Sequence, residues 1–189
     1  MKARFILIFL LAAAGGFGCV AHNKNPKYSN TLHHWTRAKE SFQKDLHFIS
    51  VKANATLLSP DMVMAQANEV AQIYASEAEQ QKYLDQTLAD THGTITFFVS
   101  FYGYDRKYAD LSRVNSSWKL YLDNRGVRLE PIKIDKIRYL TPLQRRLYPY
   151  VDAWSSFYFV TFAKNGNADY HDLTLSIRGP DGRADLFWP

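Results

Sequence analysis

The spacing of hydrophobic residues changes near residue 93, from a helical period to a period of two. Before that point the chain first predicts a short helix over residues 31–44. Residues 48–57 follow as an extended segment, in which apolar and polar side chains alternate from residue 50 on. This alternation is typical of a strand with one buried face, so we expect the segment to be the first strand of the fold.

A long helix is predicted next. The tripeptide Ser-Pro-Asp at 59–61 is a helix start, because serine caps, proline fits the first helical position and aspartate suits the positive end of the helix dipole. Apolar residues then fall near one face to about residue 90, and the pattern allows a break around 77–82. Gly93 can supply the left-handed residue just past the end.

Beyond residue 93, apolar side chains recur at every second position in several short runs. Turn sequences rich in glycine, asparagine and aspartate separate these runs at 123–126, 165–167 and 179–182. The predicted strands cover residues 95–102, 118–122, 127–129, 132–134, 157–163, 173–177 and 186–188. Short strands with turns between them are typical of an antiparallel sandwich or small barrel.

The pattern therefore predicts a mainly β fold with some helix. We expect an antiparallel β-sandwich, immunoglobulin-like or similar, that occupies residues 31–189 as a single domain. The helix at about 60–90 is expected as an insertion between the first two strands, the first of them being the strand near residue 50. Its apolar face should pack on a sheet of the same chain, although the same face could also serve a helical partner.

The N-terminus has the three parts of an export signal. Residues 1–4 are short and basic, residues 5–14 are an unbroken apolar run, and residues 15–18 are glycine except for Phe17. The chain's one cysteine, Cys19, follows directly. With the cysteine in this place, the segment resembles a bacterial lipoprotein signal. Gly18 fits the family pattern, whereas Gly16 and Phe17 stand where the pattern has an aliphatic and a small residue.

The resemblance implies that residues 1–18 are a signal peptide and that the Cys19 thiol carries a diacylglycerol. Residues 19–30 would then be a lipidated, irregular tether to the domain. Two or more acyl chains hold a protein stably on a membrane, whereas one does so only marginally. In the family, an aspartate just after the cysteine commonly marks retention in the inner membrane. Val20 and Ala21 stand there instead, which favours the outer membrane, facing the periplasm.

Composition adds few constraints. Removing residues 1–18 takes away Lys2 and Arg4, so the net charge falls from +5 to +3 and the mature chain is only mildly basic. The chain has 12 Tyr, 12 Phe and 4 Trp, an aromatic content that suits β-structure. No nucleic-acid recognition motif is present, and the sequence suggests no cofactor.

The strongest candidate binding site is an aromatic loop after the strand at 95–102. Its members combine tyrosines, which give a large rigid contact area, with charges of both signs: Tyr102, Tyr104, Asp105, Arg106 and Tyr108. Loops on a rigid scaffold often carry binding sites. The alternative is that these rings fold back on the edge of the sandwich.

Two weaker candidates involve charged residues. The first is a basic stretch that could meet lipid phosphates, unless it is an ordinary solvated face: Arg125, Arg128, Lys133, Lys136, Arg138, Arg145 and Arg146. The second is Asp169-Tyr170-His171-Asp172, with His92 elsewhere, in which a histidine and an acid could serve a hydrolase; Ser155 or Ser156 would be the nucleophile. His22, His33 and His34 lack the companion ligands of a metal site, so none is assigned.

We therefore expect a lipid-anchored envelope lipoprotein that binds a protein partner or forms part of an envelope or secretion assembly, without catalysis. The alternative is a periplasm-facing hydrolase or small-ligand carrier with a site at one end of the sandwich. The lipidated Cys19 and the loop around Tyr104 are the residues on which these expectations depend.

Overall fold

The computed structural model describes residues 26–42, 48–164 and 170–189. The predicted signal peptide, Cys19 and the first part of the tether lie outside these ranges. The helices are α1 (Pro26–Trp35), α2 (Pro60–Tyr74), α3 (Glu77–Thr91) and α4 (Pro142–Leu147). The strands are β1 (Thr36–Phe42), β2 (Ile49–Leu57), β3 (Thr94–Gly103), β4 (Lys119–Asn124), β5 (Val127–Leu129), β6 (Pro131–Ile137), β7 (Ser156–Ala163), β8 (Leu173–Gly179) and β9 (Gly182–Trp188).

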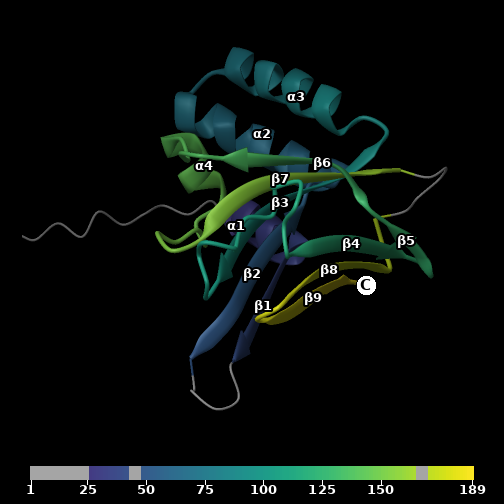
Figure 1. Ribbon diagram of the computed structural model, residues 1–189. Coiled ribbons are helices and arrows are strands. Elements are labelled where there is room, and N and C mark those ends of the chain that lie inside the picture. The colour runs from purple at the N-terminus through teal and green to yellow at the C-terminus, as the bar shows by residue number, and fades with distance from the viewer. Residues whose placement is uncertain (1–25, 43–47, 165–169) are drawn as a thin grey trace, which may run out of the picture.

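Two antiparallel sheets face each other, with helices on the outer side of the larger one (Figure 1). The larger sheet has the strand order β1-β2-β3-β7-β6, and the smaller one has the order β5-β4-β8-β9. Between them lies a core in which Phe97 meets Trp188 at 5.1 Å and Phe101 meets Trp118 at 4.8 Å between ring centroids. The prediction of a mainly β, sandwich-like fold is thus confirmed.

The alternation of β3 explains why the larger sheet separates two apolar layers. Phe97, Val99 and Phe101 point into the core between the sheets. Phe98, on the opposite face, is also fully buried, because the segment after α4 lies over it. The ring of Tyr148 stacks on Phe98 with a centroid distance of 3.7 Å and an angle of 4°.

The predicted position of the helical insertion is wrong. The helices α2 and α3 lie between β2 and β3, which are the second and third strands of the fold. The strand near residue 50 is not the first one, because an additional strand, β1, precedes it. Residues 31–44 were expected to form one helix, but the helix ends at Trp35 and the chain continues as β1. Strand β1 pairs with β2 from Thr36↔Thr56 onward, so backbone hydrogen bonds to a neighbouring strand override the local helical composition.

Part of the predicted tether also belongs to the folded structure. The helix α1 begins at Pro26, inside the stretch 19–30 that was expected to be irregular. Tyr28 is only 6% exposed, and its hydroxyl donates a hydrogen bond of 2.5 Å to the carbonyl oxygen of Leu147. Burial of this ring against α4 stabilises α1, although the mostly polar sequence of α1 does not predict a folded segment.

The predicted helix start at Ser59 is confirmed, and the long helix is divided. The Ser59 hydroxyl accepts a hydrogen bond from the amide of Met62 at 3.2 Å. Ala75 adopts a left-handed conformation with φ 48°, which ends α2, and Ser76 caps α3 by accepting from the amide of Glu79 at 3.3 Å. No helix within the described ranges is long and apolar enough to span a membrane.

Candidate functional site

The loop that begins at the end of β3 contributes to a shallow aromatic pocket on the outer face of the larger sheet. Tyr102 is paired with Lys52 of β2 and lies on that outer face. The amide of Tyr104 donates to the carbonyl oxygen of Ser50 at 2.9 Å, so the chain still follows β2 as it leaves the sheet. The pocket has a volume of about 330 Å³ and is lined by Phe48, Ile49, Lys52, Tyr102, Tyr104, Asp152 and Trp154. We call it the aromatic pocket.

Two pairs of groups shape the rim of the aromatic pocket. The rings of Phe48 and Tyr104 stack with a centroid distance of 4.3 Å. The guanidinium of Arg106 lies 5.4 Å from the centroid of Trp154, and its Nη2 donates to the carbonyl oxygen of Trp154 at 3.1 Å. A cation over an indole face is attractive, so Arg106 fixes this ring while leaving it accessible. Tyr104 and Trp154 remain 57% and 68% exposed.

Two lining residues of the aromatic pocket, Lys52 and Asp152, form an ion pair. Lys52 Nζ lies 3.3 Å from Asp152 Oδ2 and 3.8 Å from Glu40 Oε1. Burial raises the pKa of Asp152, but hydrogen bonds from Ser155 and from the amide of Trp154 outweigh that effect, so the pKa lies below its usual value. Asp152 Oδ1 accepts from the amides of Trp154 and Ser155, each at 2.9 Å. The carboxylate therefore holds the turn that presents Trp154.

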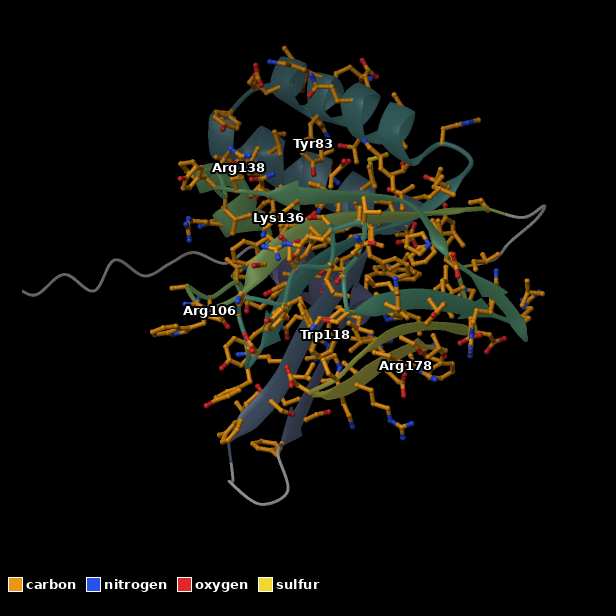
Figure 2. All side chains as sticks on the ribbon, in the orientation of Figure 1. Tyr83, Arg106, Trp118, Lys136, Arg138 and Arg178 are labelled. Carbon is orange, nitrogen blue, oxygen red and sulfur yellow. The ribbon has the colours of Figure 1, made fainter. Side chains whose placement is uncertain are left out.

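The structure brings some of the predicted loop residues together and separates others. Tyr102 and Tyr104 line the aromatic pocket, and Arg106, which Figure 2 labels, lies against the lining residue Trp154. Asp105 does not line it; its carbonyl oxygen accepts from the amides of Tyr108 and Ala109, each at 3.0 Å, and this closes the loop. Tyr108 is 51% exposed, with Lys107 Nζ 5.3 Å from its ring centroid, and does not line the pocket either.

Sequence reasoning missed most of the residues that line the aromatic pocket. Phe48, Lys52, Asp152 and Trp154 are far from residue 104 in sequence, and no local motif links them. The pairing of β2 with β3 brings in the first two residues, and the segment between α4 and β7 brings in the last two. The one local signal was the Asp-x-Trp-Ser sequence at 152–155, since an aspartate accepts readily from amides two and three residues on.

Asp110 anchors the far end of this loop to the sheet. Its side chain accepts from Lys136 Nζ of β6 at 2.8 Å and from the amide and hydroxyl of Ser112 at 3.1 and 2.8 Å. Burial raises the pKa of Asp110, but the bonds from Lys136 and Ser112 outweigh it and lower the pKa from 3.8 to about 2. The ionised carboxylate is therefore a structural element of the loop.

A pH dependence of stability follows from Asp110. A carboxyl group whose pKa is lower in the folded state stabilises the fold above its unfolded pKa, and this contribution is lost as the pH falls through the folded pKa. Asp110→Asn should lower the free energy of unfolding at pH 7 by about 2 kcal/mol. The variant should also lose less stability than the parent between pH 4 and pH 2. Urea denaturation across this pH range measures both effects, and parallel curves for the two proteins would contradict the assignment.

The basic stretch is largely neutralised by acidic neighbours. Its members Arg125, Arg128, Lys133, Lys136 and Arg146 each lie within 4.0 Å of a carboxylate oxygen, of Asp172, Asp123, Asp135, Asp110 and Glu69 in that order. Arg138, labelled near α4 in Figure 2, and Arg145 have no such ion pair in the described part of the chain. The stretch is thus a series of ion pairs more than a continuous basic surface.

The histidine candidates do not form a constellation among the residues that the structure places. His171 Nδ1 lies 2.9 Å from the main-chain oxygen of Pro189, the residue that follows β9. Ser156 begins β7 in the other sheet, and no hydrogen bond joins it to His171 in the described ranges. His92 directly follows α3, and Asp169 lies outside the described residues.

Comparison with known proteins does not assign the chain to a family. No protein-family model matches the chain, and neither the curated proteins nor the solved structures contain a significant match.

Proposed function

We propose that this protein is a lipid-anchored lipoprotein of the cell envelope that binds a protein partner and catalyses no reaction. The N-terminal signal that ends at Cys19 supports the location, with the outer membrane, periplasmic side, as the expected site. The aromatic pocket supports the binding role and is the observation on which this role rests. An anchored domain with an exposed aromatic recess is suited to hold a partner at the membrane surface.

The composition of the aromatic pocket fits a protein partner. Tryptophan, tyrosine and arginine dominate the binding energy of protein interfaces, and here Trp154 and Tyr104 line the pocket while Arg106 lies against Trp154. Exposed rings that are already held in place lose little entropy when a partner covers them. A recess of about 330 Å³ is large enough to receive one or two partner side chains.

The charged groups of the aromatic pocket serve its shape. Lys52 contacts two carboxylates, and Asp152 is committed to the amides that present Trp154. A general base works best when its pKa lies near the working pH, whereas the pKa of Asp152 is lowered from an already acidic value. These properties favour recognition over proton transfer.

Site-specific crosslinking tests the proposal. A photoreactive phenylalanine analogue at position 104 should give one discrete crosslinked product in native membranes, and the same analogue at Tyr139 should not. Tyr139 is a suitable control because it is 88% exposed and does not line the pocket. Adding Trp154→Ala to the position-104 protein should reduce the product about tenfold, since a central interface tryptophan commonly contributes 2 kcal/mol or more.

Two results would contradict the proposal. Equal products from positions 104 and 139 would indicate contact by chance, and a product unaffected by Trp154→Ala would place the interface elsewhere. The melting temperature of each variant serves as the control for folding.

A further inference from the structure

A second, larger cavity lies on the same outer face of the larger sheet, under α3. Its volume is about 640 Å³, within the range of small-molecule sites. The residues of the sheet that line it include Thr94 and Thr96 of β3 and Phe159 and Thr161 of β7. Opposite them stand Tyr83, Thr87 and Thr91 of α3, and the α4 region closes one end. We call this space the α3 cavity.

The α3 cavity exists because α3 presents a polar face to the sheet. Tyr83, Thr87 and Thr91 are four residues apart and therefore lie on one side of the helix. Figure 2 shows Tyr83 on the side of α3 that faces the sheet. Short hydroxyl side chains on both walls cannot close the gap as apolar side chains would, so the space remains open.

The back of the α3 cavity is held by a buried hydrogen-bond network. The hydroxyl of Tyr83 donates to Gln66 Oε1 at 3.0 Å, and Gln66 Nε2 donates to the Tyr148 hydroxyl at 2.9 Å. Gln66 and Tyr148 are 0% and 2% exposed. A network of this kind joins α2, α3 and the segment after α4, which makes the cavity a fixed feature of the fold.

The lining divides into an apolar and a hydroxyl side. Leucine and aromatic side chains supply the apolar part, namely Leu58, Leu143, Leu147, Tyr148 and Phe159. The hydroxyls of Thr94, Thr96 and Thr161 form a chain, with Oγ1–Oγ1 distances of 3.3 Å between the first two and 3.4 Å between the last two. The Thr94 hydroxyl donates to the carbonyl oxygen of Thr91 at 3.1 Å and the Thr96 hydroxyl donates to Thr161, so the row offers a ligand the Thr161 proton and the remaining acceptor lone pairs.

The α3 cavity offers no unpaired charge. Lys133 and Asp135 are its charged lining residues, and Lys133 Nζ lies 2.7 Å from Asp135 Oδ2. Their side chains are 66% and 50% exposed, which places them at the mouth. An ionised ligand inside would lose its hydration without a counter-charge, at a large cost.

We propose that the α3 cavity binds a neutral amphipathic small molecule, with its apolar part against the leucine and aromatic side chains and its hydroxyl groups along the threonine row. This site is separate from the aromatic pocket, because the segment carrying Tyr148 lies over the sheet between them. The inference therefore does not depend on the proposed partner binding.

Four probes separate the features of such a ligand. Octyl glucoside, below its critical micelle concentration, has a neutral hydroxylated head and an apolar chain. Octyl sulfate and octyltrimethylammonium keep the chain but carry charge, and glucose has no chain. We expect octyl glucoside to bind saturably with one site per chain and to raise Tm by about 3 to 6 °C at ten times its Kd. The three other probes should give no saturable binding.

Filling the α3 cavity should abolish this binding. Thr87→Trp on the helix and Thr161→Trp on the sheet approach the cavity from opposite walls, so a loss of folding in one leaves the other as a test. Each should weaken octyl glucoside binding by about tenfold or more, which calorimetric titration can measure. The matched control is Thr174→Trp on β8 of the smaller sheet, outside the cavity.

Three outcomes would overturn the proposal. The absence of saturable binding would mean that the space holds only water. Equal binding of octyl sulfate would show that the site does not select neutral molecules. Unchanged binding in the two filled variants, with Tm showing that they fold, would place the octyl glucoside elsewhere on the protein.

Discussion

Replacing Tyr148 with alanine is expected to lower the free energy of unfolding by about 3 to 5 kcal/mol, as is typical of a buried aromatic residue. The ring is 2% exposed and stacks on Phe98 between the larger sheet and the helices. No neighbouring side chain can refill that space without leaving its own contacts. The hydroxyl also belongs to the Gln66 network, so the alanine variant loses a packing contact and a hydrogen bond together.

The two contributions can be separated by Tyr148→Phe. This variant keeps the stacked ring but leaves Gln66 Nε2 without the acceptor that now lies at 2.9 Å, which should cost about 1 to 3 kcal/mol. Urea denaturation followed by circular dichroism measures both variants. Tyr139→Ala, at a position that is 88% exposed, should change stability by less than about 0.5 kcal/mol. A similar small loss in Tyr148→Ala would contradict the role assigned to this ring.

The second large effect is expected at Cys19. Cys19→Ser should move the protein from the membrane fraction to the soluble periplasmic fraction, or leave it as an unprocessed precursor. A serine hydroxyl cannot replace the thiol to which lipoprotein signals attach diacylglycerol. The chain has 1 Cys, so no other thiol can substitute for it. Membrane fractionation and the intact mass of the mature protein measure the two consequences.

A control for this experiment lies two residues earlier. Phe17→Ala gives the signal the small residue that the lipoprotein pattern has at this place, so processing should be unchanged or faster. A membrane-bound and normally matured Cys19→Ser protein would rule out the lipid anchor at this residue. Loss of the mature, membrane-bound form in both variants would indicate that any substitution near the cleavage site disturbs processing.

Most of the strands that were predicted correctly have a buried face, although β5 and β6 were also predicted and most of their side chains are exposed. From Ile95 to Phe101 every second side chain enters the core between the sheets. These positions are therefore apolar, and large apolar residues recur with a period of two in the sequence. The strand β1 gives no such signal, because most of its side chains are exposed and it is held mainly by its pairing with β2. An edge strand of this kind is selected by backbone hydrogen bonds, which do not depend on residue type.

The sequence also contains a signal for the start of α3. Ser76 and Glu79 have the spacing of a serine cap with an acid three residues on, which predicts a helix start at that point. In the site, the clustered tyrosines were visible, whereas Lys52 and Trp154 enter through contacts between distant segments. Such contacts depend on the register in which β2 pairs with β3 and on the path of the segment between α4 and β7. Neither can be read from the local sequence.

The distribution of indole rings makes the aromatic pocket spectroscopically distinct. Of the 4 Trp in the chain, Trp35, Trp118 and Trp188 are at most 8% exposed, whereas Trp154 is 68% exposed. The buried rings therefore emit at shorter wavelengths, and the long-wavelength part of the fluorescence comes mainly from Trp154. A soluble quencher such as acrylamide will act on that part first. Any molecule that covers Trp154 will protect it, so the native protein carries its own reporter of occupancy.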